Sequence, residues 1–250
     1  MRLLDALAYS SLWVAAAAAA LVAAASRALE IPFDLRLAGL AAAGTLLVYN
    51  VDRLRDLERD RLTAPVRSAF VERWRNALLG LAATAAAAAV ALTWLSGPRV
   101  FLVLLPTAAA GLLHRRLKHL VWAKGGYIAL SWTVVAVGLP AVTAAAPQNT
   151  LQVSVIVLLA VYANAIASNI RDAEAGAARI GLQRALHISR LVAGASLLVA
   201  AVGPTPVRPL LAVPLLTLGA LVFFRADERY GLVVVDGALL GGALIAALSP

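Results

Sequence analysis

Long apolar runs, each followed by a short connection, recur along the whole 250-residue chain. A helix of roughly 20 apolar residues crosses the hydrocarbon core of a bilayer, and its backbone groups are all paired within the helix. Nine segments approach this length: 7–26, 34–51, 76–96, 99–114, 126–146, 151–170, 187–203, 207–224 and 231–249. The pattern predicts an all-α polytopic membrane protein, a bundle of nine transmembrane helices that forms a single domain over residues 1–250.

The composition excludes several classes of protein. Hydrophobic residues make up 62% of the chain, charged residues make up 14%, and the mean hydropathy is +0.86, which excludes a soluble globular fold. The absence of cysteine excludes disulfides, thiolate metal sites and cysteine nucleophiles. The net charge of +9 does not indicate a nucleic-acid partner, because the basic residues lie in the connections between apolar runs. The partner that this composition predicts is the lipid bilayer.

The distribution of lysine and arginine predicts the orientation of the chain. One side of the membrane would hold Arg2, seven arginines from Arg53 to Arg75, Arg115, Arg116, Lys118, Lys124, Arg171, Arg179, Arg184, Arg190, Arg225 and Arg229. The other side would hold only Arg27, Arg36, Arg99 and Arg208. By the positive-inside rule the first side is cytoplasmic, so we expect a cytoplasmic N-terminus, an external C-terminus and a location in a bacterial inner membrane.

An acidic stretch follows the second apolar segment, at its predicted cytoplasmic end. Asp52, Asp56 and Asp60 recur every fourth residue, so on a helix each lies only about 40° round from the last and the three share one face. Like charges at this spacing destabilise a helix, and Mg²⁺ carrying substrate phosphates would compensate them. The alternative is a solvated helix end without a ligand, in which Arg53, Arg55 and Arg59 form ion pairs with the acids.

A second polar stretch lies at the predicted cytoplasmic end of segment 151–170. Asn164, Ser168 and Asp172 repeat the every-fourth spacing, and Asn169 and Glu174 lie beside them. Two oxygen-rich helix ends on one side of the membrane predict an internal repeat around a central cavity that opens toward the cytoplasmic face. Helix capping and hydrogen bonding between helices are the alternative explanation for the Asn and Ser residues. An acid such as Asp172 inside a bundle normally has a partner or a ligand.

Basic residues near both stretches are candidates for binding a diphosphate. Lys118 and Lys124 are the only lysines, and a mobile ammonium suits a diphosphate as a point charge. Arg67 and Arg171 offer the planar fork that clamps phosphate with two hydrogen bonds. As anchors under the positive-inside rule, these residues need no ligand.

Aromatic residues on segments that adjoin the polar stretches have two possible roles. Most are expected in the interfacial belt, but their π faces can also stabilise a developing carbocation. The residues concerned are Tyr49, Tyr127, Trp132 and Tyr162. Tyr49 and its neighbour Asn50 are assigned to substrate binding. Asp236 is a further acid within an apolar segment, and the sequence leaves open whether it pairs with an arginine or extends toward the interface.

Three motifs in this chain resemble those of the UbiA-type intramembrane prenyltransferases. The stretch DRLRDLERD, from Asp52 to Asp60, resembles the first aspartate-rich signature of that family, with Asp52 in the place of its Asn. The stretch SNIRDAEAG, from Ser168 to Gly176, is similar to the second signature, and RRLKHL resembles a basic loop between them. In two positions the chain departs from the family, because Ser168 replaces Asn or Asp and Gly176 replaces the last carboxylate. The second metal site therefore has fewer oxygens than is usual.

The resemblance implies a Mg²⁺-dependent transferase. It would move an isoprenyl group from an isoprenyl diphosphate to a lipophilic, aromatic acceptor. The resemblance assigns catalysis to Asp56, Asp60 and Asp172, and metal binding to Asp52, Asp56, Asp60, Asn169, Asp172 and Glu174. It assigns substrate binding to Arg67, Lys118, Lys124, Arg171, Tyr49 and Asn50. Protein partners are not indicated.

Two other functions stay open from the sequence. A terpene cyclase on the same scaffold would ionise the diphosphate with the same residues and capture the cation on the substrate's own double bonds. A non-catalytic relative would bind lipid, act in assembly, or transport a small solute with Asp172 and Asp236. Transporters carry their ionisable groups near the membrane midplane, whereas the polar residues here gather at one face. That asymmetry favours chemistry at one end of the bundle.

Overall fold

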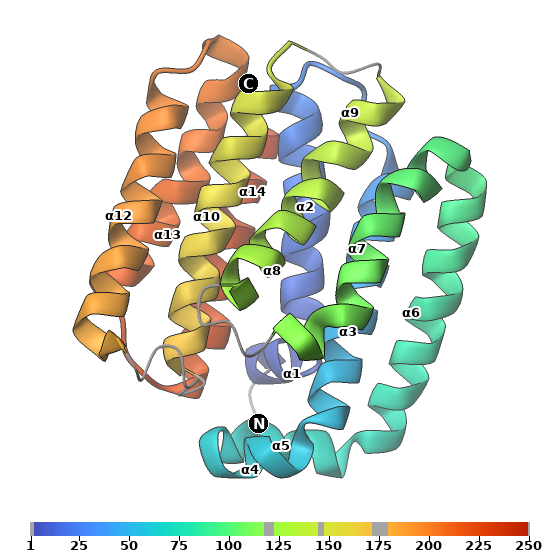
Figure 1. Ribbon diagram of the computed structural model, residues 1–250, viewed down its shortest axis with the longest axis vertical. Coiled ribbons are helices and arrows are strands. Elements are labelled where there is room, and N and C mark those ends of the chain that lie inside the picture. The colour runs from blue at the N-terminus through green and yellow to red at the C-terminus, as the bar shows by residue number, and fades with distance from the viewer. Residues whose placement is uncertain (1–2, 118–122, 145–147, 172–179, 250) are drawn as a thin grey trace.

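The structure is a computed structural model that describes residues 3–117, 123–144, 148–171 and 180–249. Over these residues the fold is all-helical and contains no strand (Figure 1). The elements in chain order are α1 (Leu3–Tyr9), α2 (Leu12–Ala28), α3 (Leu35–Arg55), α4 (Leu57–Thr63), α5 (Pro65–Arg73), α6 (Arg75–Ser96), α7 (Pro98–Leu117), α8 (Ala123–Thr133), the π-helix η1 (Val134–Gly138), α9 (Leu139–Thr143), α10 (Thr150–Arg171), α12 (Leu182–Ala201), the 3₁₀-helix η2 (Thr205–Leu211), α13 (Ala212–Val222), the π-helix η3 (Tyr230–Val235) and α14 (Asp236–Leu248). The predicted all-α class is confirmed for the part of the chain that is described.

Within the described residues, six helical stretches are long and apolar enough to cross a membrane, and a bent pair, α1 with α2, makes a seventh if it counts as one span. The six are α6, α8 to α9, α10, α12, η2 to α13, and η3 to α14. α3 is not among them, because Arg36 near its start and Asp52 and Arg53 near its end lower its hydropathy. α7 counts only as a shorter apolar helix, over Pro98–Ala109. A multi-pass membrane protein is therefore supported, whereas nine spans and a central cavity stay predictions.

The alanine-rich helix α2 runs through the middle of the bundle (Figure 1). It packs against α14 on one side and α3 on the other, and η1 and η2 also contact it. Ala17, Leu21 and Ala25 on this helix are 0% exposed. In a lipid solvent, small side chains stabilise helix pairs by letting their backbones approach closely. The alanine runs therefore build the core as well as the predicted spans.

The outer helices expose large apolar side chains. Val90 and Trp94 on α6 are 71% and 87% exposed, and Leu198 on α12 is 68% exposed. α6 and α12 lie on opposite edges of the bundle in Figure 1. Water would disfavour so much apolar surface, whereas hydrocarbon solvates it. This surface agrees with a location inside a bilayer.

The first predicted segment, 7–26, is not one straight helix. The chain breaks at Ser10 and Ser11, where α1 and α2 meet at 75°, and Ser11 adopts a left-handed conformation with φ of 66°. A break frees carbonyl groups at the end of the first helix. The buried Arg53 on α3 donates from Nη1 to the carbonyls of Ala8 and Tyr9. A distant arginine therefore completes the hydrogen bonding that the break leaves open.

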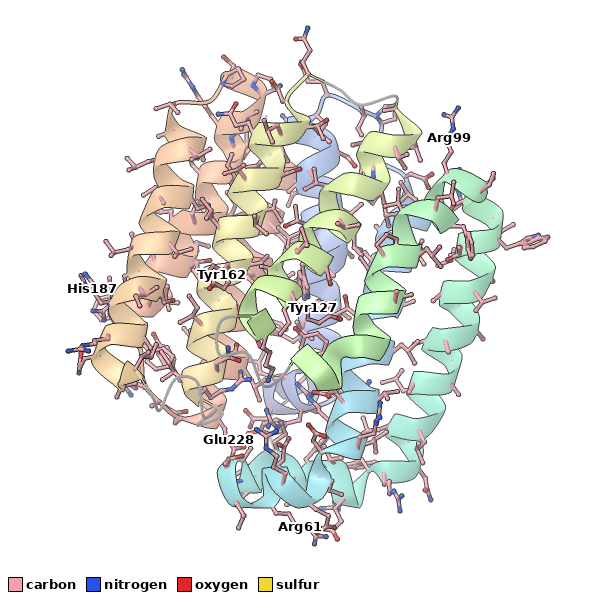
Figure 2. All side chains as sticks on the ribbon, in the orientation of Figure 1. Arg61, Arg99, Tyr127, Tyr162, His187 and Glu228 are labelled. Carbon is pink, nitrogen blue, oxygen red and sulfur yellow. The ribbon has the colours of Figure 1, made fainter. Side chains whose placement is uncertain are left out.

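The two ends of the bundle are formed by different parts of the chain. α4 and α5 lie across one end, where α1 is also found, and α14 finishes at the other end (Figure 1). Figure 2 shows Arg61 and Glu228 at the first end and Arg99 at the second. We call the end that holds α1, α4 and α5 the polar end. It is the end that the arginine distribution predicts to be cytoplasmic.

Candidate functional site

Three aspartates follow one another at one-turn intervals where α3 passes into α4. The backbone N–H of Asp56 donates to the carbonyl of Asp52 at 2.9 Å, and that of Asp60 donates to the carbonyl of Asp56 at 2.9 Å. The hydrogen-bond ladder continues across the junction of the two helices. The three residues therefore follow one side of a helical path, which is the arrangement that their spacing predicts.

Arg67 on α5 lies directly beside this acidic side. Its Nη2 donates to Oδ2 of Asp60 at 2.9 Å, and the two side chains are only 7% and 19% exposed. A charge-assisted pair at this distance is a strong hydrogen bond. The arginine that the sequence predicts to clamp a diphosphate is thus held at the polar end by a predicted catalytic acid.

Glu228 fixes the start of α5 from a distant part of the chain. Its carboxylate accepts hydrogen bonds from the backbone N–H groups of Arg67 at 2.9 Å and Val66 at 3.3 Å. These N–H groups are among the donors that a helix leaves unsatisfied at its N-terminus. Glu228 precedes η3, so the last span and the α4–α5 segment are tied together. Sequence reasoning missed this residue because no local spacing points to a contact over 161 positions.

Asn50, which the sequence assigns to substrate binding, is fully buried at the break between α1 and α2. Its Oδ1 accepts from the Ser11 hydroxyl at 3.2 Å, and its Nδ2 donates to the Ser10 carbonyl at 3.2 Å. Its exposed fraction is 0%. The amide therefore stabilises the break together with Arg53, which lies one turn further along the same helix. Spacing alone gives no sign of this contact with the first helix.

An ion pair links α10 with α14. Nη1 of Arg171 lies 3.9 Å from Oδ2 of Asp236, with side-chain exposures of 7% and 10%. Asn164 donates from Nδ2 to Oδ1 of Asp236 at 3.3 Å and to the Val235 carbonyl at 3.1 Å. The sequence left open whether Asp236 pairs with an arginine, and in the structure it pairs with Arg171.

Gly231 makes room for the Arg171 side chain. A Cβ atom at position 231 would lie 2.3 Å from Cδ of Arg171 and 3.1 Å from its Cγ. No real Cβ approaches another atom so closely, so any larger residue would displace the arginine or the helix. Gly231 belongs to η3, and π-turns of this kind occur often at functional sites. The π-turn and the glycine together bring α14 against the end of α10.

The two polar stretches of the sequence meet in three dimensions. The buried Arg53 of α3 interacts electrostatically with Arg67, Arg171 and Asp236. Tyr49 interacts with the same aspartate and with Arg53 and Arg171. Residues from α3, α5, α10 and α14 thus form one cluster of like and unlike charges. The predicted convergence of the two motif-bearing helix ends is visible in this cluster.

Two tyrosines on α8 and α10 lie further into the bundle. The Tyr127 hydroxyl hydrogen-bonds with Ser131, and the ring is close enough to Asp52 to interact with its charge. A Cβ atom on Gly125 would lie 3.0 Å from the ring of Tyr162, so α8 and α10 approach each other closely here. Figure 2 shows both tyrosines between the polar end and the opposite end that holds Arg99.

Several predicted site residues lie outside the described residues, namely Lys118, Asp172 and Glu174. Asn169 is in the last turn of α10 and is half-buried. Lys124 is near the start of α8 and is also half-buried. The proposed second metal site therefore has one described member, Asn169.

The described residues contain no group of three or more His, Cys, Asp or Glu side chains placed to hold a metal ion. Asp52 and Asp60 are two turns apart on the helical path, roughly 12 Å along a helix axis, and Asp56 lies one turn from each. A magnesium ion shared by these three residues stays a prediction.

Comparison of the chain with protein-family models, curated proteins and solved structures found no match.

Proposed function

We propose that the protein is an intramembrane transferase that moves an isoprenyl group from an isoprenyl diphosphate to a lipophilic, aromatic acceptor. The observation that carries this proposal is the convergence of two polar helix ends, far apart in sequence, in one buried charge cluster. Arg53 on α3 and Arg171 on α10 are electrostatic neighbours there, with the Asp52 to Asp60 path at the same end. A site for a polyanion with an apolar tail needs both charge at one end and an apolar bundle behind it.

Arginines supply the anion-binding part of the proposed site. Arg67 and Arg171 are each less than one tenth exposed, so their charges are little screened by water. Preorganised cations of this kind stabilise negative charge that develops on a leaving group. Lys118 and Lys124 are further proposed ligands of the diphosphate.

The oxygen donors fit Mg²⁺, a hard cation that is typically held by one or two carboxylates and substrate phosphates. A neighbouring pair, Asp52 with Asp56 or Asp56 with Asp60, would hold one ion, and Asn169, Asp172 and Glu174 would supply a second set of ligands. Bound there, Mg²⁺ acts as a Lewis acid that neutralises the diphosphate.

The proposed reaction transfers a carbon group. The allylic C–O bond breaks and its electron pair leaves on the diphosphate, where Arg67 and Arg171 stabilise the charge. An electron pair of the acceptor then forms the new bond to carbon, and the acceptor loses a proton. Tyr127 and Tyr162 would face the developing cation with their π systems. Apolar surroundings exclude water, which would otherwise quench the cation.

A non-catalytic membrane protein is the second candidate function. It is favoured by the contacts that several predicted site residues already make inside the protein: Asp60 with Arg67, Arg171 with Asp236, and Asn50 with the α1–α2 break. In this candidate the ion pairs would serve only to hold the helices together. Gly176, which stands where the second signature has its last carboxylate, also favours a non-catalytic protein.

Product analysis tests these functions. Detergent-purified protein is incubated with Mg²⁺ and isoprenyl diphosphates of increasing length, with and without membrane lipid extract, and products are identified by mass spectrometry. The comparison includes Asp56→Ala and, as a matched control, Glu58→Ala, since the Glu58 side chain is 81% exposed on the same short helix. We expect an adduct only with extract, lost by roughly a hundredfold or more in Asp56→Ala and retained in Glu58→Ala.

The other outcomes identify the alternatives. A cyclic hydrocarbon or alcohol formed without extract would indicate a terpene cyclase on this scaffold. No product from any diphosphate, together with an unchanged cellular phenotype in Asp56→Ala, would overturn the catalytic proposal and favour the non-catalytic membrane protein.

A further inference from the structure

The buried ion pair between α10 and α14 differs from the other buried pair at the polar end. Arg67 and Asp60 are 2.9 Å apart, a normal distance for a charge-assisted hydrogen bond. Arg171 and Asp236 are 3.9 Å apart, which is too long for a hydrogen bond. The second pair is therefore held by charge and has little directional bonding.

Each partner of the long pair is fixed by something other than its counter-ion. Asn164 on α10 holds Oδ1 of Asp236 with a hydrogen bond of 3.3 Å. The stem of Arg171 runs along Gly231, where a Cβ atom would come within 2.3 Å of it. Each side chain therefore has a neighbour besides its counter-ion.

Arg171 nevertheless requires a counter-ion, because a charge that is taken out of water and left unpaired is costly. A further arginine, Arg53, is close enough to repel it. Asp236, which is only 8% exposed, offers a single negative charge from the neighbouring helix. A diphosphate carries more charge than this carboxylate and reaches hydrogen-bond distance, so it would compete successfully for the guanidinium.

We propose that Asp236 is the resting counter-ion of Arg171 and that a diphosphate replaces it on binding. This inference rests on the proposed function, because it assumes that the anion which reaches the polar end is a diphosphate. Asp236 would then be a positioning residue, which acts on the ligand only through Arg171. It would hold the arginine ready without binding the substrate, and it would weaken affinity enough for the diphosphate product to leave.

A purely structural ion pair makes the opposite prediction. If Asp236 served only to hold α14 against α10, its neutralisation would loosen the site and weaken or leave unchanged the binding of an anion. If it competes with the ligand, neutralisation strengthens binding. The sign of the change in affinity therefore distinguishes the two roles.

The test measures binding of inorganic pyrophosphate with Mg²⁺ to the full-length protein in detergent, by titration calorimetry. We expect Asp236→Asn to lower the Kd roughly tenfold, because the Arg171 guanidinium then has no carboxylate at position 236 that competes with the ligand for it. Asp236→Glu should raise the Kd several-fold, because the longer side chain closes the 3.9 Å gap to Arg171 and competes better. Arg171→Gln should raise the Kd.

The double variant Arg171→Gln with Asp236→Asn isolates the interaction between the two residues. Its Kd should equal that of Arg171→Gln alone, because in this proposal Asp236 acts on the ligand only through Arg171. It also removes both charges of the pair, so neither charge of the pair is left buried without its partner. Circular dichroism and thermal unfolding establish that each variant retains its helices.

The outcomes separate this inference from the function on which it rests. Unchanged or weaker binding in Asp236→Asn, with the fold intact and wild-type binding measurable, would overturn the counter-ion role and leave the diphosphate site standing. A tenfold gain that persists in the double variant would also overturn it. If the wild-type protein binds no pyrophosphate, both proposals fail together. Should Asp236→Asn not fold, the several-fold loss in Asp236→Glu decides the matter, and an unchanged Kd there counts against the proposal.

Discussion

Polar side chains at the polar end fall into two groups, which differ in the atoms that they contact. Asn50 and Arg53 bond to backbone and hydroxyl groups of the first helices, so they maintain a broken helix. Arg67 and Arg171 instead pair with carboxylates. Sequence spacing grouped Asn50 with the substrate-binding residues because it adjoins the acidic stretch. The two groups differ in the atom that each side chain contacts, and the spacing of residues in the sequence does not reveal that atom.

Replacing Asn50 tests this separation. Asn50→Ala leaves the Ser10 carbonyl and the Ser11 hydroxyl without their buried partner, so we expect a loss of roughly 1–3 kcal/mol in the free energy of unfolding. Thermal unfolding in detergent measures the loss. Ser168→Ala, which removes one polar group from a half-buried helical position, serves as the control. A Kd for pyrophosphate that rises in Asn50→Ala at unchanged stability would instead support the substrate-binding role.

At the level of elements, irregular helices position the site. The break between α1 and α2, the junction of α3 and α4, and the π-turn η3 each bring a polar group to a place that a straight helix would not. η3 is the clearest case, since it carries the glycine beside Arg171 and ends at Val235, directly before Asp236. Apolar periodicity predicts that a helix is present but contains no information about one extra residue in a turn.

A glycine substitution tests the close approach at η3. Gly231→Ala would place a Cβ atom 2.3 Å from Arg171, so either the helix or the arginine must shift. We expect a loss of about 1–3 kcal/mol in unfolding free energy, together with weaker pyrophosphate binding. The control is Gly194→Ala on α12, where a Cβ atom meets nothing within 4 Å and alanine favours the helix. Equal stability of the two variants would show that η3 accommodates a side chain at position 231.

At the scale of the whole molecule, most of the arginines are predicted to lie at one end of the bundle and few at the other. Arg61 lies at the polar end and Arg99 at the other (Figure 2). We propose nine membrane crossings, with the polar end and the N-terminus in the cytoplasm and the C-terminus outside. An odd number of crossings agrees with the opposite placement of α1 and the end of α14 in Figure 1.

Cysteine labelling tests the orientation. The chain contains no cysteine, so single-cysteine variants report one position each. In intact bacterial cells that express the protein, an impermeant maleimide should label Arg99→Cys and should label Arg61→Cys only after the membrane is permeabilised. The reverse pattern would place the polar end outside the cell. Labelling of both positions in intact cells would contradict a membrane between the two ends.

The sequence by itself determined the class of the fold and the position of the polar groups along the chain. Hydrophobic runs of bilayer length leave a chain few choices other than membrane helices, because every backbone group must be paired inside the segment. Arginine placement likewise predicts two unlike ends. The helical spacing of Asp52, Asp56 and Asp60 is visible in the sequence because it depends only on local geometry.

Only the tertiary structure decided which residues meet. Arg171 faces Asp236 on the last helix, Glu228 caps α5, and Arg53 closes the break behind α1, and each contact joins residues that lie at least 44 positions apart. Such pairs depend on which alanine-rich helices pack together. The apolar surfaces of these helices are so similar that their sequences hardly indicate which helix packs against which. Polar groups buried in a bundle find partners because unpaired charge is costly there, but which partner is available is a property of the packed whole.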